Sequence, residues 1–148
     1  MRRLALVLTL LACDSGPAGE GPNESWAYAV ARPDCAPWDG AATAVYLTDS
    51  PADSALSTPT PFLRLGVYHH IGGVRGRRWS LGEDGPDGAV AVFCGAEAAC
   101  VSATSGWIEF TPGGTGPLSG QYDVTFPDGR RRAGHFSAPV QEIAALCG

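Results

Sequence analysis

The sequence of 148 residues contains no lysine, so its ten basic residues are all arginines. Fifteen Asp and Glu residues outnumber them, and the formal net charge at pH 7 is -5. Phosphate backbones and anionic lipid head groups repel an acidic chain. The charge balance therefore disfavours a nucleic-acid-binding protein and direct adsorption to an anionic bilayer.

Long apolar stretches and a sustained helical period are also missing. The longest nearly unbroken apolar run, residues 4–12, has nine residues, whereas a membrane-spanning helix needs about 20. No segment repeats apolar residues at the 3.6-residue period of an amphipathic helix. These absences exclude a polytopic membrane protein and a coiled coil, and the length fits one compact domain.

Large aliphatic and aromatic side chains are scarce in the part of the chain that should fold. Beyond residue 12, Leu, Ile, Val and Phe together make up about 18% of the residues, below the level of about 20% at which folding from a hydrophobic core alone becomes doubtful. Cross-links between cysteines are the obvious way to compensate for a thin core.

The first 12 residues have the layout of an export signal. Met1-Arg2-Arg3 is a short positive start, and residues 4–12 suit the apolar region of a secretory signal peptide. The run ends in Leu10-Leu11-Ala12-Cys13, which resembles the lipobox of bacterial lipoproteins. The resemblance implies cleavage before Cys13, lipidation of Cys13, and a chain held at a membrane of the cell envelope, facing the periplasm or the cell surface. The resemblance covers lipoproteins of either the inner or the outer membrane, and a secreted protein with an unpaired Cys13 is the alternative.

Residues 13–24 contain no large apolar side chain after the cysteine. Such a composition is typical of a flexible tether. We therefore expect a signal peptide over residues 1–12, a lipidated cysteine and tether over 13–24, and one folded domain over 25–148.

The folded part has the two-residue period of half-buried strands. In residues 118–126, Leu118, Tyr122 and Phe126 fall on one face and polar side chains on the other. A Pro-Asp-Gly turn at 127–129 and the alternation in 133–138 complete a predicted hairpin. The other predicted strands are 26–32, 43–48, 62–70, 78–81, 89–94, 100–104 and 107–111.

About eight or nine short strands predict an all-β domain, an antiparallel β-sandwich or barrel. Residues 141–146 are expected to form one short helical turn. Residues 48–61, with three prolines, form the longest turn-like stretch, and a loop of that length is usually functional or mobile.

Four cysteines remain when Cys13 is set aside, and cysteines of an exported chain should form disulfides. Three pairings are possible. Cys94 and Cys100 bracket a hairpin-length loop of five residues, which favours their pairing and leaves Cys35 with Cys147. A zinc site is the alternative, but the C-x-x-C spacing that it would use is absent.

Motifs for catalysis or metal binding are sparse. His69 and His70 are neighbours on a predicted strand and should point to opposite faces, and His135 stands alone. The acidic run 83–88 and the arginines of 75–78 and 130–132 suit solvated turns. We find no Ser-His-Asp set, carboxylate pair, phosphate loop or cofactor motif, and so predict no catalytic residue, no metal ligand and no cofactor.

Two tryptophans are candidate ligand-binding residues. Trp38 lies in a Pro-Trp-Asp-Gly turn, and Trp107 alternates with Glu109 on the face opposite Ile108 and Phe110. Exposed aromatic rings suit sugars and protein partners, although packing into the core is the more common fate of a tryptophan.

The last third of the chain carries a second resemblance. Its sequence runs through Ser105-Gly106, Leu118-Ser-Gly-Gln-Tyr-Asp-Val-Thr-Phe126, Asp128-Gly129 and Gly134-His-Phe-Ser-Ala-Pro139 to Cys147. This is similar to uncharacterised predicted lipoproteins of Gram-negative bacteria that share the pattern SGxYxVxFxDGxxxxGxFxAP…C. The resemblance implies a small β-sandwich on a lipid anchor and implies no activity.

These observations favour a lipid-anchored protein of the cell envelope that acts as a non-enzymatic binding or structural module. Its expected partners are the membrane, through Cys13, and an envelope protein or a glycan. The alternatives are an envelope hydrolase with a site built from loops, and an inhibitor or accessory subunit that uses residues 48–61 as its contact.

Overall fold

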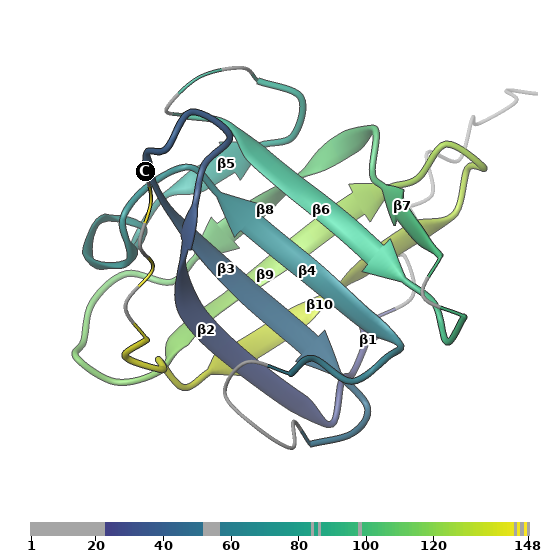
Figure 1. The fold of residues 1–148 in the computed structure, drawn as a ribbon, viewed down its shortest axis with the longest axis horizontal. Coiled ribbons are helices and arrows are strands. Elements are labelled where there is room, and N and C mark those ends of the chain that lie inside the picture. The colour runs from purple at the N-terminus through teal and green to yellow at the C-terminus, as the bar shows by residue number, and fades with distance from the viewer. Residues whose placement is uncertain are drawn as a thin grey trace, which may run out of the picture.

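A computed structural model describes residues 23–51, 57–83, 85, 87–97, 99–143, 145 and 147. In this part of the chain two five-stranded sheets pack face to face as a β-sandwich (Figure 1). The predicted all-β sandwich is therefore confirmed. No helix in the described residues is long and apolar enough to cross a membrane.

The first sheet has the order β1-β10-β9-β8-β5 and the second the order β2-β3-β4-β6-β7. The two-residue β1 pairs parallel to β10, and the other neighbours pair antiparallel. The strands of the first sheet are β1 (Asn23–Glu24), β5 (Arg78–Ser80), β8 (Ser105–Phe110), β9 (Leu118–Thr125) and β10 (Arg131–Ala138). Those of the second are β2 (Tyr28–Cys35), β3 (Ala41–Thr48), β4 (Phe62–Val67), β6 (Ala89–Cys94) and β7 (Cys100–Ser102), and a 3-10 helix η1 (Ile71–Gly73) follows β4.

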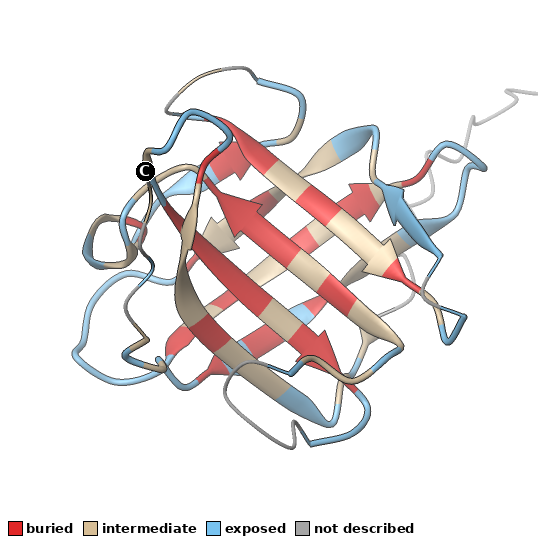
Figure 2. Ribbon diagram, viewed as in Figure 1, coloured by how far each residue is buried: buried red, intermediate tan, exposed pale blue. Residues whose placement is uncertain are grey.

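The core lies between the sheets because the longer strands turn alternate side chains inward (Figure 2). Strand β9 alternates strictly between buried and half-buried residues. Strand β8 buries Ile108 and Phe110 and turns Trp107 and Glu109 outward. The predicted hairpin of β9 and β10 forms around the turn in which Gly129 has φ 81°.

Three expectations about element ends are wrong. Strand β4 ends at Val67 rather than residue 70. Residues 141–143 form no helical turn, because the tail pairs with the β2 edge through Ala31 N–H to the Pro139 carbonyl and Gln141 N–H to the Ala31 carbonyl. The sheet also includes Asn23 and Glu24, which the sequence places in the tether, because β10 offers them a free edge.

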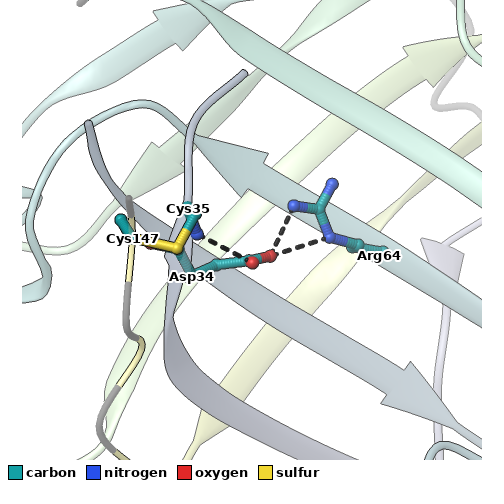
Figure 3. The surroundings of a disulfide bond; sticks show 4 residues. All are labelled: Asp34, Cys35, Arg64 and Cys147. Carbon is teal, nitrogen blue, oxygen red and sulfur yellow. Dashed lines mark hydrogen bonds and ion pairs between the residues drawn. A yellow bond between two sulfur atoms is a disulfide. The ribbon is translucent and has the colours of Figure 1, made fainter. Parts of the chain in front are cut away.

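The two favoured disulfides are both present. Cys94 and Cys100 join β6 to β7 with 4.0 Å between their Cα atoms. Cys35 and Cys147 join the end of β2 to the C-terminal tail, with a Cα–Cα distance of 5.5 Å (Figure 3). The expected signal peptide, Cys13 and the tether up to residue 22 lie outside the described residues.

Candidate functional site

The outer face of the second sheet is covered by its own polar side chains. Along β3 the core residues Val45 and Leu47 alternate with Ala42 and Ala44, so the two alanines face outward. They are nevertheless only 2% and 0% exposed. Small residues at these positions leave room for longer side chains from β2 and β4 to lie flat across the sheet.

An ion pair between Asp34 and Arg64 lies at the centre of this layer of polar side chains. Arg64 Nη2 lies 2.6 Å from Asp34 Oδ2, and Arg64 Nε donates to the same oxygen (Figure 3). Asp34 Oδ1 accepts the N–H of Cys35, so the pair adjoins the long disulfide. Burial by itself would lower the pKa of Arg64, but the hydrogen bond and negative charge of Asp34 outweigh it and raise that pKa above its ordinary value.

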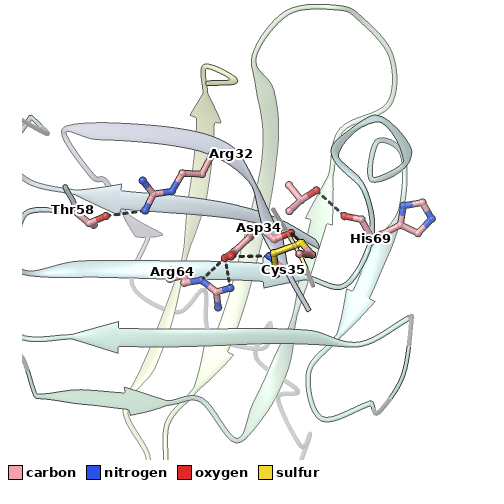
Figure 4. Close-up of polar contacts among 8 residues, drawn as sticks. Arg32, Asp34, Cys35, Thr58, Arg64 and His69 are labelled. Atoms are coloured by element: carbon pink, nitrogen blue, oxygen red, sulfur yellow. Dashed lines mark hydrogen bonds and ion pairs between the residues drawn. A yellow bond between two sulfur atoms is a disulfide. The ribbon is translucent and has the colours of Figure 1, made fainter. Parts of the chain in front are cut away.

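A second arginine connects the sheet to the stretch that precedes β4. The Arg32 guanidinium donates to Thr58 Oγ1 (Figure 4). It also lies 4.0 Å from the centre of the Tyr46 ring. The Tyr46 ring also packs against Phe62 at 5.9 Å. The contact between Arg32 and Thr58 therefore holds residues 57–59 over the outer face of β2 and β3.

A groove of about 230 Å3 opens where this stretch meets β2 and the C-terminal tail. Tyr28 at its border is 47% exposed. The side-chain amide of Gln141 contributes to the wall, and its Oε1 atom is buried without a hydrogen-bond partner in the described structure. The groove is lined by Tyr28, Ala29, Val30, Tyr46, Thr48, Pro51, Ser57, Thr58, Pro59, Pro139 and Gln141.

The lining has a distinct chemical character. Its described residues combine aromatic and proline rings with hydroxyl groups and one amide, and none of them carries an acidic, basic or imidazole side chain. Side chains of these kinds interact with ligands through ring packing and hydrogen bonds.

The two predicted ligand-binding tryptophans do not form a common site. Trp38 is 48% exposed in the β2–β3 turn and packs edge-on against Tyr68 at 4.9 Å. Trp107 is half-buried on the outer face of the first sheet, with the Arg78 guanidinium 4.1 Å from its ring centre. They belong to different sheets, and no ring contact joins them.

The other two tryptophans serve the interior. Trp79 is 2% exposed, and Trp26 donates its indole N–H to the hydroxyl of Tyr122 at 3.0 Å. Burial raises the pKa of Tyr122 well above its ordinary value. Arg132 pairs with Glu24 at 2.7 Å beside this cluster and fastens β1 to the edge of the first sheet.

The side chains of the two neighbouring histidines are not placed as the sequence predicts. Because β4 ends at Val67, His69 and His70 lie in a turn, and their ring centres are only 4.5 Å apart instead of on opposite faces. His135 is exposed on β10 and borders a separate hollow with Glu109 and Gln121. Among the described residues no three His, Cys, Asp or Glu side chains gather as a metal-binding group.

Tyr28 and Tyr46 are the residues of the groove that the sequence interpretation missed. A signal was present, since both occupy the outward positions of strands whose inward positions hold Ala31, Val45 and Leu47. An aromatic ring on a solvent-facing position of a strand indicates a surface that something covers.

Comparisons with protein-family models, with curated proteins and with solved structures give no match to this chain.

Proposed function

We propose that the protein is a lipid-anchored binding module of the cell envelope and that its groove receives one sugar residue of an envelope glycan. The observation that carries this proposal is the lining of the groove, whose described residues offer an exposed ring, hydroxyls and an amide but no acid or base other than phenols. The position of Tyr28, at the border of the groove and half exposed, supplies the ring against which a sugar packs.

The groove chemistry favours a hydroxylated ligand over a purely apolar one. The apolar face of a sugar packs on an aromatic ring, and its hydroxyl groups donate and accept hydrogen bonds at the edges. Thr48, Ser57 and Thr58 of the lining carry hydroxyl groups that suit such a ligand.

Binding is favoured over hydrolysis for a chemical reason. Most glycoside hydrolases use a pair of carboxyl groups, one as the acid and the other as the base or nucleophile. The described residues of the groove lining include neither Asp nor Glu. Glu109 borders a different hollow, where Arg78 and Gln121 both donate to its carboxylate, so it is held as a structural partner.

Export and anchoring are supported by two separate features. The two disulfides suit an oxidising compartment, and the lipobox-like sequence that ends at Cys13 suits attachment to a bilayer. Replacing Cys13 by Ser should move the protein from the membrane fraction to the soluble fraction of cells. Unchanged partitioning of the Cys13→Ser variant would reject the anchor while leaving the groove untested by that experiment.

The binding proposal is tested by titrating the full-length protein in detergent with soluble oligosaccharides from envelope glycans and measuring heat of binding. Tyr28→Ala should weaken binding by at least about tenfold, a change of about 1.4 kcal/mol. Trp38→Ala is the matched control, because Trp38 is an aromatic residue of almost equal exposure outside the groove lining.

Equal loss in the two variants, or full affinity in Tyr28→Ala, would show that the groove is not the binding site. A proline-rich peptide provides the competing ligand class, since aromatic-lined grooves also receive such peptides. Binding of the peptide and of no oligosaccharide would overturn the glycan proposal.

A further inference from the structure

The turn after β4 brings two imidazole rings together in an arrangement that the groove does not use. The ring centres of His69 and His70 are 4.5 Å apart, and their planes are inclined by 35°. Consecutive residues of a strand would point to opposite faces, but the chain leaves the strand at Val67 and enters η1 at Ile71. The bend between these elements turns both side chains to one side.

A glycine makes the room that the two rings share. A Cβ atom at Gly73 would lie 2.2 Å from His69 Cε1, 2.6 Å from His69 Nδ1 and 2.8 Å from His70 Nε2. Both rings therefore border the same small space above the 3-10 helix. Any residue with a side chain at position 73 would push them away.

The backbone that carries the pair is attached firmly to the sandwich. Thr43, fully buried in β3, donates its hydroxyl to the carbonyl of His69 at 2.8 Å (Figure 4). The His69 N–H bonds to the Val67 carbonyl at 2.9 Å, and the Gly73 N–H bonds to the His70 carbonyl at 2.9 Å. The positions from which the two rings project are thus set by the sheet and not by a free loop.

We propose that His69 and His70 form a two-nitrogen site for a divalent first-row transition-metal ion, which Cu2+ fills most tightly. Imidazole suits Cu2+, Ni2+ and Zn2+, and Cu2+ binds most strongly in that series. Two imidazoles bound side by side to one ion, with metal–nitrogen bonds of about 2.0–2.1 Å, place their ring centres about 4.5–5 Å apart. The observed separation of 4.5 Å meets that requirement.

The His69 nitrogen that borders the shared space makes only a long contact with the backbone. His69 Nδ1 lies 3.3 Å from the carbonyl oxygen of His70, which is longer than the usual range of about 2.7–3.2 Å for such a bond. A metal–nitrogen bond can replace this weak contact with little loss. Because no third His, Cys, Asp or Glu of the described chain joins the pair, water completes the coordination.

Trp79 provides an optical reporter for the site. Its ring centre lies 5.5 Å from that of His69, and the indole is 2% exposed. A paramagnetic ion on the imidazoles therefore quenches its fluorescence at short range, whereas the same ion elsewhere in solution reaches the buried ring poorly.

The experiment titrates the full-length protein, purified without a histidine tag, with CuCl2, and follows heat of binding and tryptophan fluorescence. The wild type should bind one ion saturably. His70→Gln should weaken binding by at least about tenfold, because even outer partners of ligating histidines contribute about 10–100-fold. His135→Gln is the matched control and should bind as the wild type does. Binding unchanged in His70→Gln, lost in His135→Gln, or without saturation would overturn the proposal.

A pair of glycine variants separates geometry from ligand removal. Gly73→Ala keeps both imidazoles but puts a methyl group into their shared space, and it should weaken Cu2+ binding as much as His70→Gln does. Gly72→Ala is its control, since a Cβ there stays at least 3.4 Å from the nearest ring atom. Neither glycine has a positive φ, so both variants should melt at the wild-type temperature. Equal affinity in the two glycine variants would contradict the shared site.

Discussion

Opening the Cys35–Cys147 disulfide should destabilise the domain much more than opening Cys94–Cys100. The first bond joins residues separated by 112 positions and the second residues separated by 6. In the chain-entropy relation, closing loops of these lengths restricts the unfolded state by about 4.8 and about 2.3 kcal/mol at 25 °C. Since small domains are stable by about 5–15 kcal/mol in total, the long bridge accounts for a large part of the stability.

The tertiary structure adds to this difference. The tail that ends at Cys147 covers the β2 edge through the hydrogen bonds of Ala31 with Pro139 and Gln141. When the disulfide is open, these two hydrogen bonds are the main backbone contact between the tail and β2 in the described structure. Packing acts in the opposite direction, because Cys94 is 3% exposed and is more buried than Cys35. If opening Cys35–Cys147 lowers the free energy of unfolding more than opening Cys94–Cys100 does, lost packing of the sulfur atoms therefore cannot be the cause.

The assay is urea unfolding of two double variants, Cys35→Ala with Cys147→Ala and Cys94→Ala with Cys100→Ala. Tryptophan fluorescence follows the transition, and linear extrapolation gives the free energy of unfolding. We expect the first variant to lose about 2–3 kcal/mol more than the second. If the short-loop variant is the less stable of the two, the loop-closure reasoning is refuted.

Three further predictions concern charges and backbone. Asp34→Ala leaves the Arg64 guanidinium partly buried and unpaired and should lower the free energy of unfolding by about 2–3 kcal/mol, whereas the double variant Asp34→Leu with Arg64→Met removes both charges and should lower it by less than about 1 kcal/mol; equal losses in urea unfolding would contradict this. Hydrogen bonds from Arg78 and Arg131 lower the pKa values of Glu109 and Asp123 below their ordinary values. The ionised carboxylates of Glu109 and Asp123 therefore stabilise the fold above about pH 4.5, and this contribution is lost as pH falls below that value. The urea midpoint should fall between about pH 5 and 3. A midpoint that does not change over this range would contradict the prediction. Gly106→Ala should cost more than about 3 kcal/mol, because Gly106 has φ 130° and its Cβ would lie 2.1 Å from the Asp123 carbonyl oxygen; a melting temperature equal to that of the wild type would show that β8 can shift.

Local patterns predicted much of the fold. The alternation in β9 indicated which of its residues face the core, because side chains of a strand alternate between the two sides of a sheet whatever the neighbouring strands are. The same rule correctly turned Trp107 and Glu109 outward. The short spacing of Cys94 and Cys100 indicated their disulfide, since a hairpin places the two ends of its loop opposite each other.

The ends of the elements were predicted less well, because they depend on distant partners. Pro139 and Gln141 pair with Ala31, more than 100 positions earlier in the chain, and this pairing holds the start of segment 141–146, where the sequence predicts a helical turn. Glu24 joins the first sheet because Arg132 and Tyr122 offer it an ion pair and a hydrogen bond. The periodicity of a short stretch of sequence carries no information about such distant partners.

The sequence by itself determined that the chain forms sheets and which residues of β9 face the core, and it favoured one of three cysteine pairings, because strand alternation and hairpin loop length are short-range properties. Only the tertiary structure decided where side chains converge. The groove needs Tyr28, Thr58 and Gln141 to meet from three distant segments. The paired rings of His69 and His70 need a strand that ends at Val67. Both depend on the register of non-local pairs, which is set by packing of the whole sandwich and not by any single stretch of residues.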